Sequence, residues 1–149
     1  MKDQSDPITP DEWLLRRVHK NEFRPTEPPS IDKYAFKPNV AGNYPDEYGI
    51  SLFRLACIEN VEQIFAKTPA SKRERYGVVR VLVSRLLEFG LIPIRDDDDE
   101  KPIVLGHVVI PELNSINYID DKDAILPLMD RLADHASEPG NVLMQPVLE

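Results

Sequence analysis

GVVRVLVSRLLEFGLIPI (residues 77–94) and PIVLGHVVIPEL (residues 102–113) are strongly apolar and lie on either side of five consecutive acidic residues, Asp96–Glu100. β-Branched residues at this density favour the half-buried surface of a sheet. Five like charges in a row remain in water, because burying them without partners is too costly. The pattern therefore predicts core strands joined by a solvent-exposed acidic loop and paired in antiparallel fashion as a hairpin.

Residues 71–90 allow two interpretations. The Ser-x-x-Glu pattern at the beginning of this segment is typical of a helix start, and one long helix would then end at the glycine. The valines of 77–83 instead favour a strand. We predict the strand, a short helix over 85–89, and further strands over 91–94 and 103–110. The single long helix stays open as the alternative.

Residues 1–48 hold seven of the fourteen prolines, which exclude long helices and favour extended chain. We therefore expect residues 1–48 to form a proline-rich arm packed on a single domain of residues 49–149. Within the arm, Thr9–Glu12 has the hydroxyl, proline and acid of a helix start, which predicts a short helix through Trp13. Leu14–Val18 also has the composition of a strand, and the sequence does not decide between the two.

Periodicity predicts three further elements. Residues 48–54 alternate apolar and polar side chains, as a half-buried strand does. Apolar residues at helical spacing predict a short amphipathic helix over 57–65 and a longer one through 125–136 that begins around 121–124. The segment 142–144 is short and apolar, and it either packs on the core or contacts a partner.

These elements alternate too irregularly for a doubly wound parallel sheet. We expect an α+β fold with a mainly antiparallel sheet of four to five strands and helices packed mostly on one face. With 149 residues the chain has the size of one domain. Its 42% hydrophobic and 30% charged residues are typical of a globular protein rather than a disordered one.

The formal net charge of −8 makes nucleic acid an unlikely partner, because a negative surface repels phosphate backbones. The basic cluster of Lys72–Arg75 with Arg80 and Arg85 is interpreted as a solvated surface, since no aromatic residues accompany it. The single cysteine, Cys57, excludes an intramolecular disulfide, and no apolar segment suits a membrane span. We expect a cytoplasmic protein without membrane contact that associates, if at all, with a protein partner or with itself.

No metal or cofactor site is predicted. The acidic run Asp96–Glu100 has enough charge for calcium, but it lacks the alternating ligands and central glycine of an EF-hand loop. One cysteine and three scattered histidines offer no paired zinc ligands. Cys57 lies on the apolar side of its expected helix and is interpreted as a small buried residue rather than a nucleophile.

The three histidines are the usual acid-base candidates. Only His107 lies inside an apolar strand. Gly106 beside it would admit a ligand, but a structurally satisfied histidine at a sheet edge is the favoured interpretation. His135 falls in the last turn of the final helix, where a cation suits the helix dipole. His19 belongs to a cationic cluster, Arg16–Lys20, which could hold a phosphate or carboxylate but is interpreted as a solvated loop paired with neighbouring acids.

Arg17, Ser51 and Glu112 lie at or near the ends of three expected strands. An arginine, a strand serine and a late glutamate hold and polarise the dinucleotide in some ADP-ribosyltransferases, and the order of the three residues here resembles that set. The resemblance implies a small enzyme acting on a nucleotide or dinucleotide. A third hypothesis is metal-independent ribonuclease activity with His19 and His107 as acid and base, which the net charge disfavours.

No nucleotide loop, metal motif or catalytic signature stands out, so the sequence favours a non-catalytic protein-interaction or regulatory module. The alternative is the small enzyme, whose candidate catalytic residues are Arg17, Ser51, His107 and Glu112. An enzyme should bring at least three of these four side chains around one pocket, whereas an interaction module should scatter them.

Overall fold

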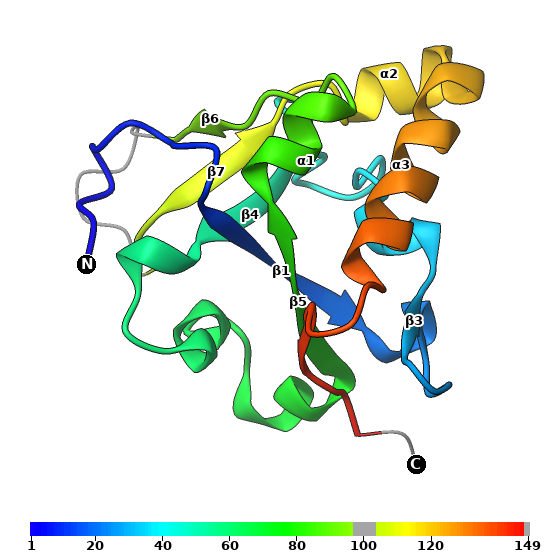
Figure 1. Cartoon of the computed structure of the whole chain (residues 1–149). Coiled ribbons are helices and arrows are strands. Elements are labelled where there is room, and N and C mark those ends of the chain that lie inside the picture. Colours follow the sequence, from blue (N-terminus) through cyan, green and yellow to red (C-terminus); the bar gives the residue numbers. More distant parts are fainter. Residues whose placement is uncertain (97–103, 148–149) are drawn as a thin grey trace.

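The computed structural model describes residues 1–96 and 104–147, and its centre is a six-stranded antiparallel sheet (Figure 1). The strand order is β6-β7-β4-β1-β5-β8. The strands are Trp13–His19 (β1), Ile50–Arg54 (β4), Tyr76–Leu82 (β5), Ile94–Arg95 (β6), His107–Ile110 (β7) and Val142–Met144 (β8). Phe23–Arg24 (β2) and Ser30–Ile31 (β3) form a separate two-stranded ribbon. The predicted α+β class is confirmed, with a larger sheet than the four to five strands expected.

Three α-helices and five 3-10 helices accompany the strands in the described part of the chain. The α-helices are Val83–Glu88 (α1), Ser115–Asp120 (α2) and Lys122–Ala136 (α3). The 3-10 helices are Lys20–Glu22 (η1), Lys33–Phe36 (η2), Leu55–Cys57 (η3), Val61–Phe65 (η4) and Ala70–Arg75 (η5). Within the described ranges, no helix combines the length and apolar composition needed to cross a membrane.

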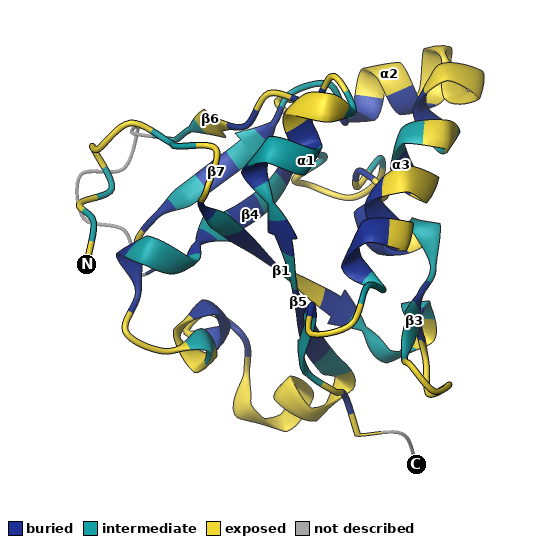
Figure 2. Cartoon of the chain, viewed as in Figure 1, coloured by how far each residue is buried: buried dark blue, intermediate teal, exposed yellow. Residues whose placement is uncertain are grey.

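Two hydrophobic cores lie on the two faces of the sheet, because side chains of a strand alternate between its faces. Leu14 of β1 belongs to the larger core, which contains α1, η2 and the apolar side of α3. Leu15, its neighbour, belongs to a smaller core closed by η4 and Val104. Figure 2 shows the buried side of α3 turned to the sheet and the largely exposed 3-10 helix η5 at the bottom of the view, away from α3. The α-helices therefore cover mainly one face, and the other face is only partly covered.

β1 is an inner strand of the sheet, although it belongs to the proline-rich segment 1–48. It pairs along its whole length with β5, from Trp13↔Leu82 to His19↔Tyr76. Of the two interpretations of this segment, the strand is correct. Thr9–Glu12 still makes the bonds of a capping motif, because the Thr9 backbone N–H donates to Glu12 Oε2 at 2.7 Å. The chain turns there without continuing into a helix.

A buried ion pair fastens the N-terminal segment to β4. Arg54 is fully buried and donates to both carboxylate oxygens of Glu12, at 2.8 and 3.0 Å. It also donates to the backbone carbonyls of Asp6 and Pro7. Burial opposes the charge of Glu12, but the bonds from Arg54 and the Thr9 N–H outweigh it and lower the pKa of the carboxyl. A charge at this depth is stable only because every donor has a partner.

Several predicted boundaries need correction. The helix predicted over 57–65 is instead η3 and η4, separated by extended chain at Ile58. The Gln63 side chain accepts the Glu59 backbone N–H at 2.8 Å, so a new helical turn starts there. The strand predicted over 91–94 begins only at β6, because Pro93 has no N–H for a ladder.

The strands and the short helix predicted on either side of the acidic loop are present in the structure, although one strand is shorter than predicted. The strand over 77–83 and the helix over 85–89 correspond to β5 and α1, so the single long helix is wrong. β6 and β7 pair in antiparallel fashion, as expected. The strand predicted over 103–110 shortens to β7, and most of the acidic loop, together with residue 103, lies outside the described residues. The segment 142–144 packs on β5 as strand β8.

Candidate functional site

β1 and β4 pair only at one end and then separate. Their pairing is limited to Leu14↔Arg54 and Leu15↔Phe53, and Figure 1 shows the two strands diverging beyond that point. Arg16 occupies the start of the opening: its Nη1 donates to the Ser51 carbonyl at 2.9 Å and its Nε donates to the Ala35 carbonyl at 3.0 Å. A side chain thus replaces the backbone ladder at the fork of the sheet.

A cavity of about 890 Å³ lies at this fork, and we call it the fork cavity. Its wall includes side chains of β1, β4 and β7, the helices η1, η2 and η4, and the segment 37–41. Strands β7, β4 and β1 are consecutive in the sheet. The volume falls within the range of small-molecule binding sites.

The fork cavity collects positive charge. Arg16, Arg17, Lys37 and Lys67 line it, against the two carboxylates of Glu22 and Asp96. None of the four cations forms an ion pair with a carboxylate in the part of the chain that the structure describes. Burial lowers the pKa of Arg16 to about 10, which still leaves the guanidinium charged at neutral pH. Cationic side chains that have no carboxylate partner favour an anionic ligand.

Ser51, His107 and Asp96 form a chain of two hydrogen bonds in the wall of the cavity. His107 Nε2 lies 2.9 Å from Ser51 Oγ, and His107 Nδ1 lies 2.8 Å from Asp96 Oδ2. A carboxylate only accepts, so the neutral ring carries its proton on Nδ1 and leaves Nε2 to accept the serine proton. About a quarter of the His107 side chain is exposed (26%), so a small molecule in the cavity can reach it.

Strand pairing explains why these three residues meet. Ser51 and Phe53 alternate with buried Ile50 and Leu52, so their side chains share the less covered face of the sheet. Phe53 pairs with His107 across β4 and β7, which brings the imidazole next to Ser51. The Asp96 N–H donates to the His107 carbonyl at 3.0 Å, so the aspartate lies opposite the histidine.

Gly106 sets the start of β7. Its φ of +78° is in the left-handed region, and a β-carbon at this position would lie 2.8 Å from Cβ of Cys57. The close approach expected at Gly106 is therefore made by Cys57 and Arg54 rather than by a ligand. Cys57 is 2% exposed and burial raises the pKa of its thiol, which agrees with a structural role.

Three of the four candidate residues line the fork cavity: Arg17, Ser51 and His107. Arg17 also donates to Thr68 Oγ1 and lies over the Tyr76 ring, 5.4 Å from its centroid. Glu112 is not among the lining residues; its Oε1 accepts the backbone N–H of Ile92.

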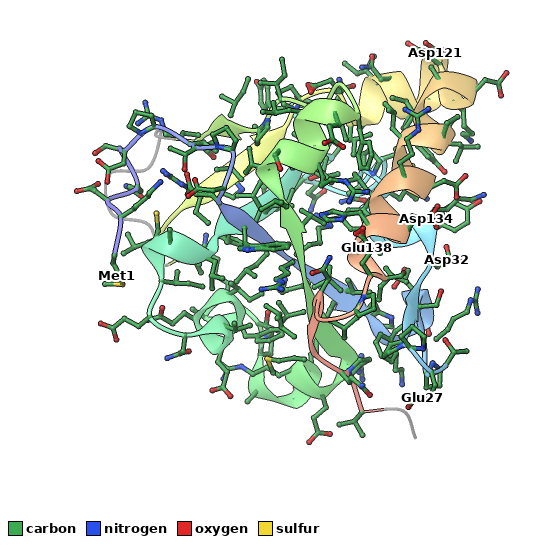
Figure 3. The ribbon with its side chains drawn as sticks, viewed as in Figure 1. Met1, Glu27, Asp32, Asp121, Asp134 and Glu138 are labelled. Carbon is green, nitrogen blue, oxygen red and sulfur yellow. The ribbon has the colours of Figure 1, made fainter. Side chains whose placement is uncertain are left out.

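Of the other two histidines, His19 lies at the fork cavity and His135 lies outside it. His19 lines the cavity, and its ring meets the Tyr76 ring edge-on at 5.3 Å. His135 is 3% exposed at the end of α3, where its Nε2 accepts the Leu82 N–H and its Nδ1 lies 2.7 Å from Glu138. Figure 3 labels Glu138 just beyond α3, in a structural cluster that is separate from the fork cavity.

The sequence does not point to a contribution from Asp96, Glu22, Lys37 or Lys67, whereas Arg16 belongs to the cationic cluster recognised as a possible phosphate or carboxylate site. The acidic run as a whole suggests only solvation, although the position of Asp96 directly after a strand is a usable signal. The cations on the segment 37–41 and near η4 give no signal, because only the fork brings them to one cavity. Among the described residues, no group of three or more histidine, cysteine or acidic side chains has the geometry of a metal site.

Comparison with known proteins adds no functional information: no family model, no curated protein and no solved structure matches this chain. The site must therefore be interpreted from its own geometry.

Proposed function

We propose that this chain is a small hydrolase that cleaves a phosphoester of a nucleotide-like molecule in the fork cavity. One observation carries the proposal. The hydrogen-bonded chain Ser51–His107–Asp96 lies in a cavity whose four Arg and Lys side chains have no carboxylate partner among the described residues. A serine beside a histidine that a carboxylate orients is the arrangement that activates serine nucleophiles on unrelated folds.

The reaction has two steps. Ser51 Oγ forms a bond to phosphorus while its proton moves to His107 Nε2, and the bond to the leaving oxygen breaks as His107 returns the proton to it. A water molecule then forms a bond to phosphorus while its proton moves to His107 Nε2, and the bond from phosphorus to Ser51 Oγ breaks as His107 returns the proton to Oγ, which restores the serine and releases the phosphate. Asp96 keeps the other ring proton on Nδ1 and stabilises the imidazolium in both steps.

The cations have a separate role. Negative charge on the phosphoryl oxygens increases during attack, and fixed cations next to those oxygens lower its free energy. Arg17 shares its sheet face with Ser51. Leu15 pairs with Phe53 on antiparallel strands, Arg17 lies two residues after Leu15, and Ser51 lies two residues before Phe53, so the two side chains lie on the same face and in the same direction from that pair. The net charge of −8 repels anions at long range, but salt screens this repulsion, and the cations that line the cavity attract a bound phosphate at short range.

A fluorophosphonate probe tests this proposal without knowledge of the substrate, because it phosphonylates activated serines. We expect one adduct per chain, mapped to Ser51 by peptide mass spectrometry and absent from Ser51→Ala. Ser84 has a similar intermediate burial, so Ser84→Ala is the matched control and should label normally. Absence of an adduct, or an adduct elsewhere that survives Ser51→Ala, would contradict the proposal.

Two alternatives use the same cavity. Cleavage of RNA is supported by the presence of both His19 and His107 in the wall, and conversion of a dinucleoside RNA phosphate that is lost in His19→Ala would favour it. ADP-ribosyl transfer has less support, because Glu112 lies outside the cavity.

The non-catalytic interaction module is the second candidate function. Within the described sheet β6 is an edge strand; Ile94 in this strand is 50% exposed and Ile92, two residues before it, is 59% exposed. Such an edge can pair with an extended segment of another protein. In that case a Pro substitution at Ile94 should abolish association with a partner or a second copy, measured by light scattering, and Ser51→Ala should leave it unchanged.

A further inference from the structure

The proposed chemistry leaves several polar residues of the fork cavity without a role, and two of these lie within three residues of each other in the chain. The first is His19, the last residue of β1, which accepts the Asn21 backbone N–H at Nδ1 over 3.1 Å. A backbone N–H only donates, so Nδ1 carries no proton and the neutral ring is protonated on Nε2. His19 therefore offers a ligand one N–H donor.

The second is Glu22 of η1. Its Oε2 is buried and has no hydrogen-bond partner among the described residues; His19 Nδ1 is 3.9 Å away and is already occupied by Asn21. A buried carboxylate oxygen without a donor is unfavourable, and native structures rarely leave one without a reason. A ligand that donates a hydrogen bond in the cavity would satisfy it.

His19 and Glu22 line the same cavity and His19 Nδ1 lies 3.9 Å from Glu22 Oε2, so one ligand group that both accepts and donates can bind to both side chains. A hydroxyl accepts from His19 Nε2 and donates to Glu22, whereas an amino group only donates and a carbonyl only accepts. Glu22 and Arg16 line the same cavity and their charges interact, so the hydroxyl subsite shares this cavity with the cations assigned to phosphate. Carboxylates hold ribose hydroxyls next to bound phosphates in dinucleotide-binding folds.

We infer that His19 and Glu22 bind a sugar hydroxyl, so that the fork cavity takes a sugar phosphate, either free or as part of a nucleotide. This inference rests on the proposed function, because it places the phosphate of the ligand on the fork cations. The catalytic chain, the cations and the hydroxyl subsite then follow one another across β7, β4, β1 and η1.

Calorimetric titration of the full-length Ser51→Ala protein tests the inference without turnover. The probes are inorganic phosphate, ribose 5-phosphate, AMP and the 2′-deoxy and 3′-deoxy forms of AMP. We expect both sugar phosphates to bind more tightly than inorganic phosphate. At least one deoxy form should bind about tenfold more weakly than AMP, the cost of one hydrogen bond to a charged group. Tighter binding of AMP than of ribose 5-phosphate assigns a nucleotide, and equal binding assigns the free sugar phosphate.

Variants of Glu22 show whether the discrimination comes from this residue. Glu22→Ala should bring the affinities for AMP and the weaker deoxy form to within about twofold, while Glu22→Gln, which keeps an acceptor, should retain part of the difference. Glu62→Ala, an exposed glutamate of η4, is the matched control and should bind as the parent does.

Three results would overturn the inference: equal affinity for AMP and both deoxy forms, discrimination that survives Glu22→Ala, or no binding of any phosphate probe. Labelling of Ser51 by the fluorophosphonate is measured separately. The failure of the hydroxyl subsite is therefore distinguishable from the failure of the proposed hydrolase.

Discussion

At the residue scale, the reactivity proposed for Ser51 depends on Asp96 as much as on His107. A serine hydroxyl is a weak nucleophile until a base accepts its proton, and the imidazole accepts it at Nε2 only while Nδ1 holds the other proton. The 2.8 Å contact between Asp96 Oδ2 and His107 Nδ1 fixes that arrangement. The carboxylate is therefore a positioning residue whose effect should appear in the reactivity of Ser51.

Asp96→Asn should slow phosphonylation of Ser51 by about 100-fold while leaving the fold intact, because an amide no longer favours the reactive tautomer or stabilises the imidazolium. The measurement is the rate of adduct formation by mass spectrometry, with the melting temperature as a check on folding. Asp120→Asn, an exposed aspartate at the end of α2, should label at the parent rate. An unchanged rate in Asp96→Asn would show that the aspartate has no part in activating the serine.

Glu22 should make stability depend on pH in an unusual direction. Burial raises the pKa of its carboxyl, although the charges of His19 and Arg16 oppose this. The folded state then holds the proton more tightly than the unfolded state, so stability is greatest below the ordinary value of 4.5 and falls as pH rises through the raised pKa.

Glu22→Gln removes this titration. Its stability relative to the parent should increase as pH rises from about 4 to about 7, measured by urea unfolding at each pH. Glu47→Gln, at a position outside the cavity, is the control and should show no such trend. A difference that stays constant with pH would contradict the buried environment assigned to Glu22.

At the element scale, the local sequence could predict strands but not their divergence. The β-branched content of 77–83 and the alternation in 48–54 predict β5 and β4 correctly, because both signals are local. The fork arises from the short pairing of β1 with β4 and from the guanidinium of Arg16 that follows it. Such long-range register is not encoded in any single segment.

The sequence could predict some residues of the candidate site but not all of them. Ser51 and His107 stand out by residue type and strand position, and Arg17 by its neighbouring charge. Asp96 does not stand out, since only its place opposite His107 distinguishes it from the acids that follow. Glu112 is a candidate only because a glutamate follows the arginine and the serine in the chain. Chain order does not determine which end of a strand faces a cavity, and Glu112 lies outside the fork cavity.

Helix α3 provides an independent test of the larger core. Leu132 is fully buried against the sheet, so Leu132→Ala should reduce the free energy of unfolding by about 2–5 kcal/mol through lost burial and a residual cavity. Urea unfolding measures this directly. Ile119→Ala, at a 62% exposed position of α2, should change it by less than about 0.5 kcal/mol. Equal effects of the two substitutions would contradict the packing of α3 on the sheet.

At the scale of the whole molecule, charge is distributed unevenly. The chain has 26 acidic and 18 basic residues, yet four Arg and Lys side chains and only two acidic ones line the fork cavity within the described part of the chain. A protein with an acidic surface gains no stability by gathering cations around an opening, because like charges repel. A ligand with phosphate charge explains both the concentration of cations and the serine chain beside them.

The most direct test of this account is whether one ligand controls access to one serine. The rate of Ser51 phosphonylation is measured while AMP is increased to saturation. We predict that the rate falls as AMP fills the fork cavity, and that Arg17→Gln shifts this protection to higher AMP concentrations, while Lys122→Gln, on α3 and outside the cavity, does not. A labelling rate of Ser51 that is unaffected by saturating AMP, or a Ser51 that never labels, would contradict the account.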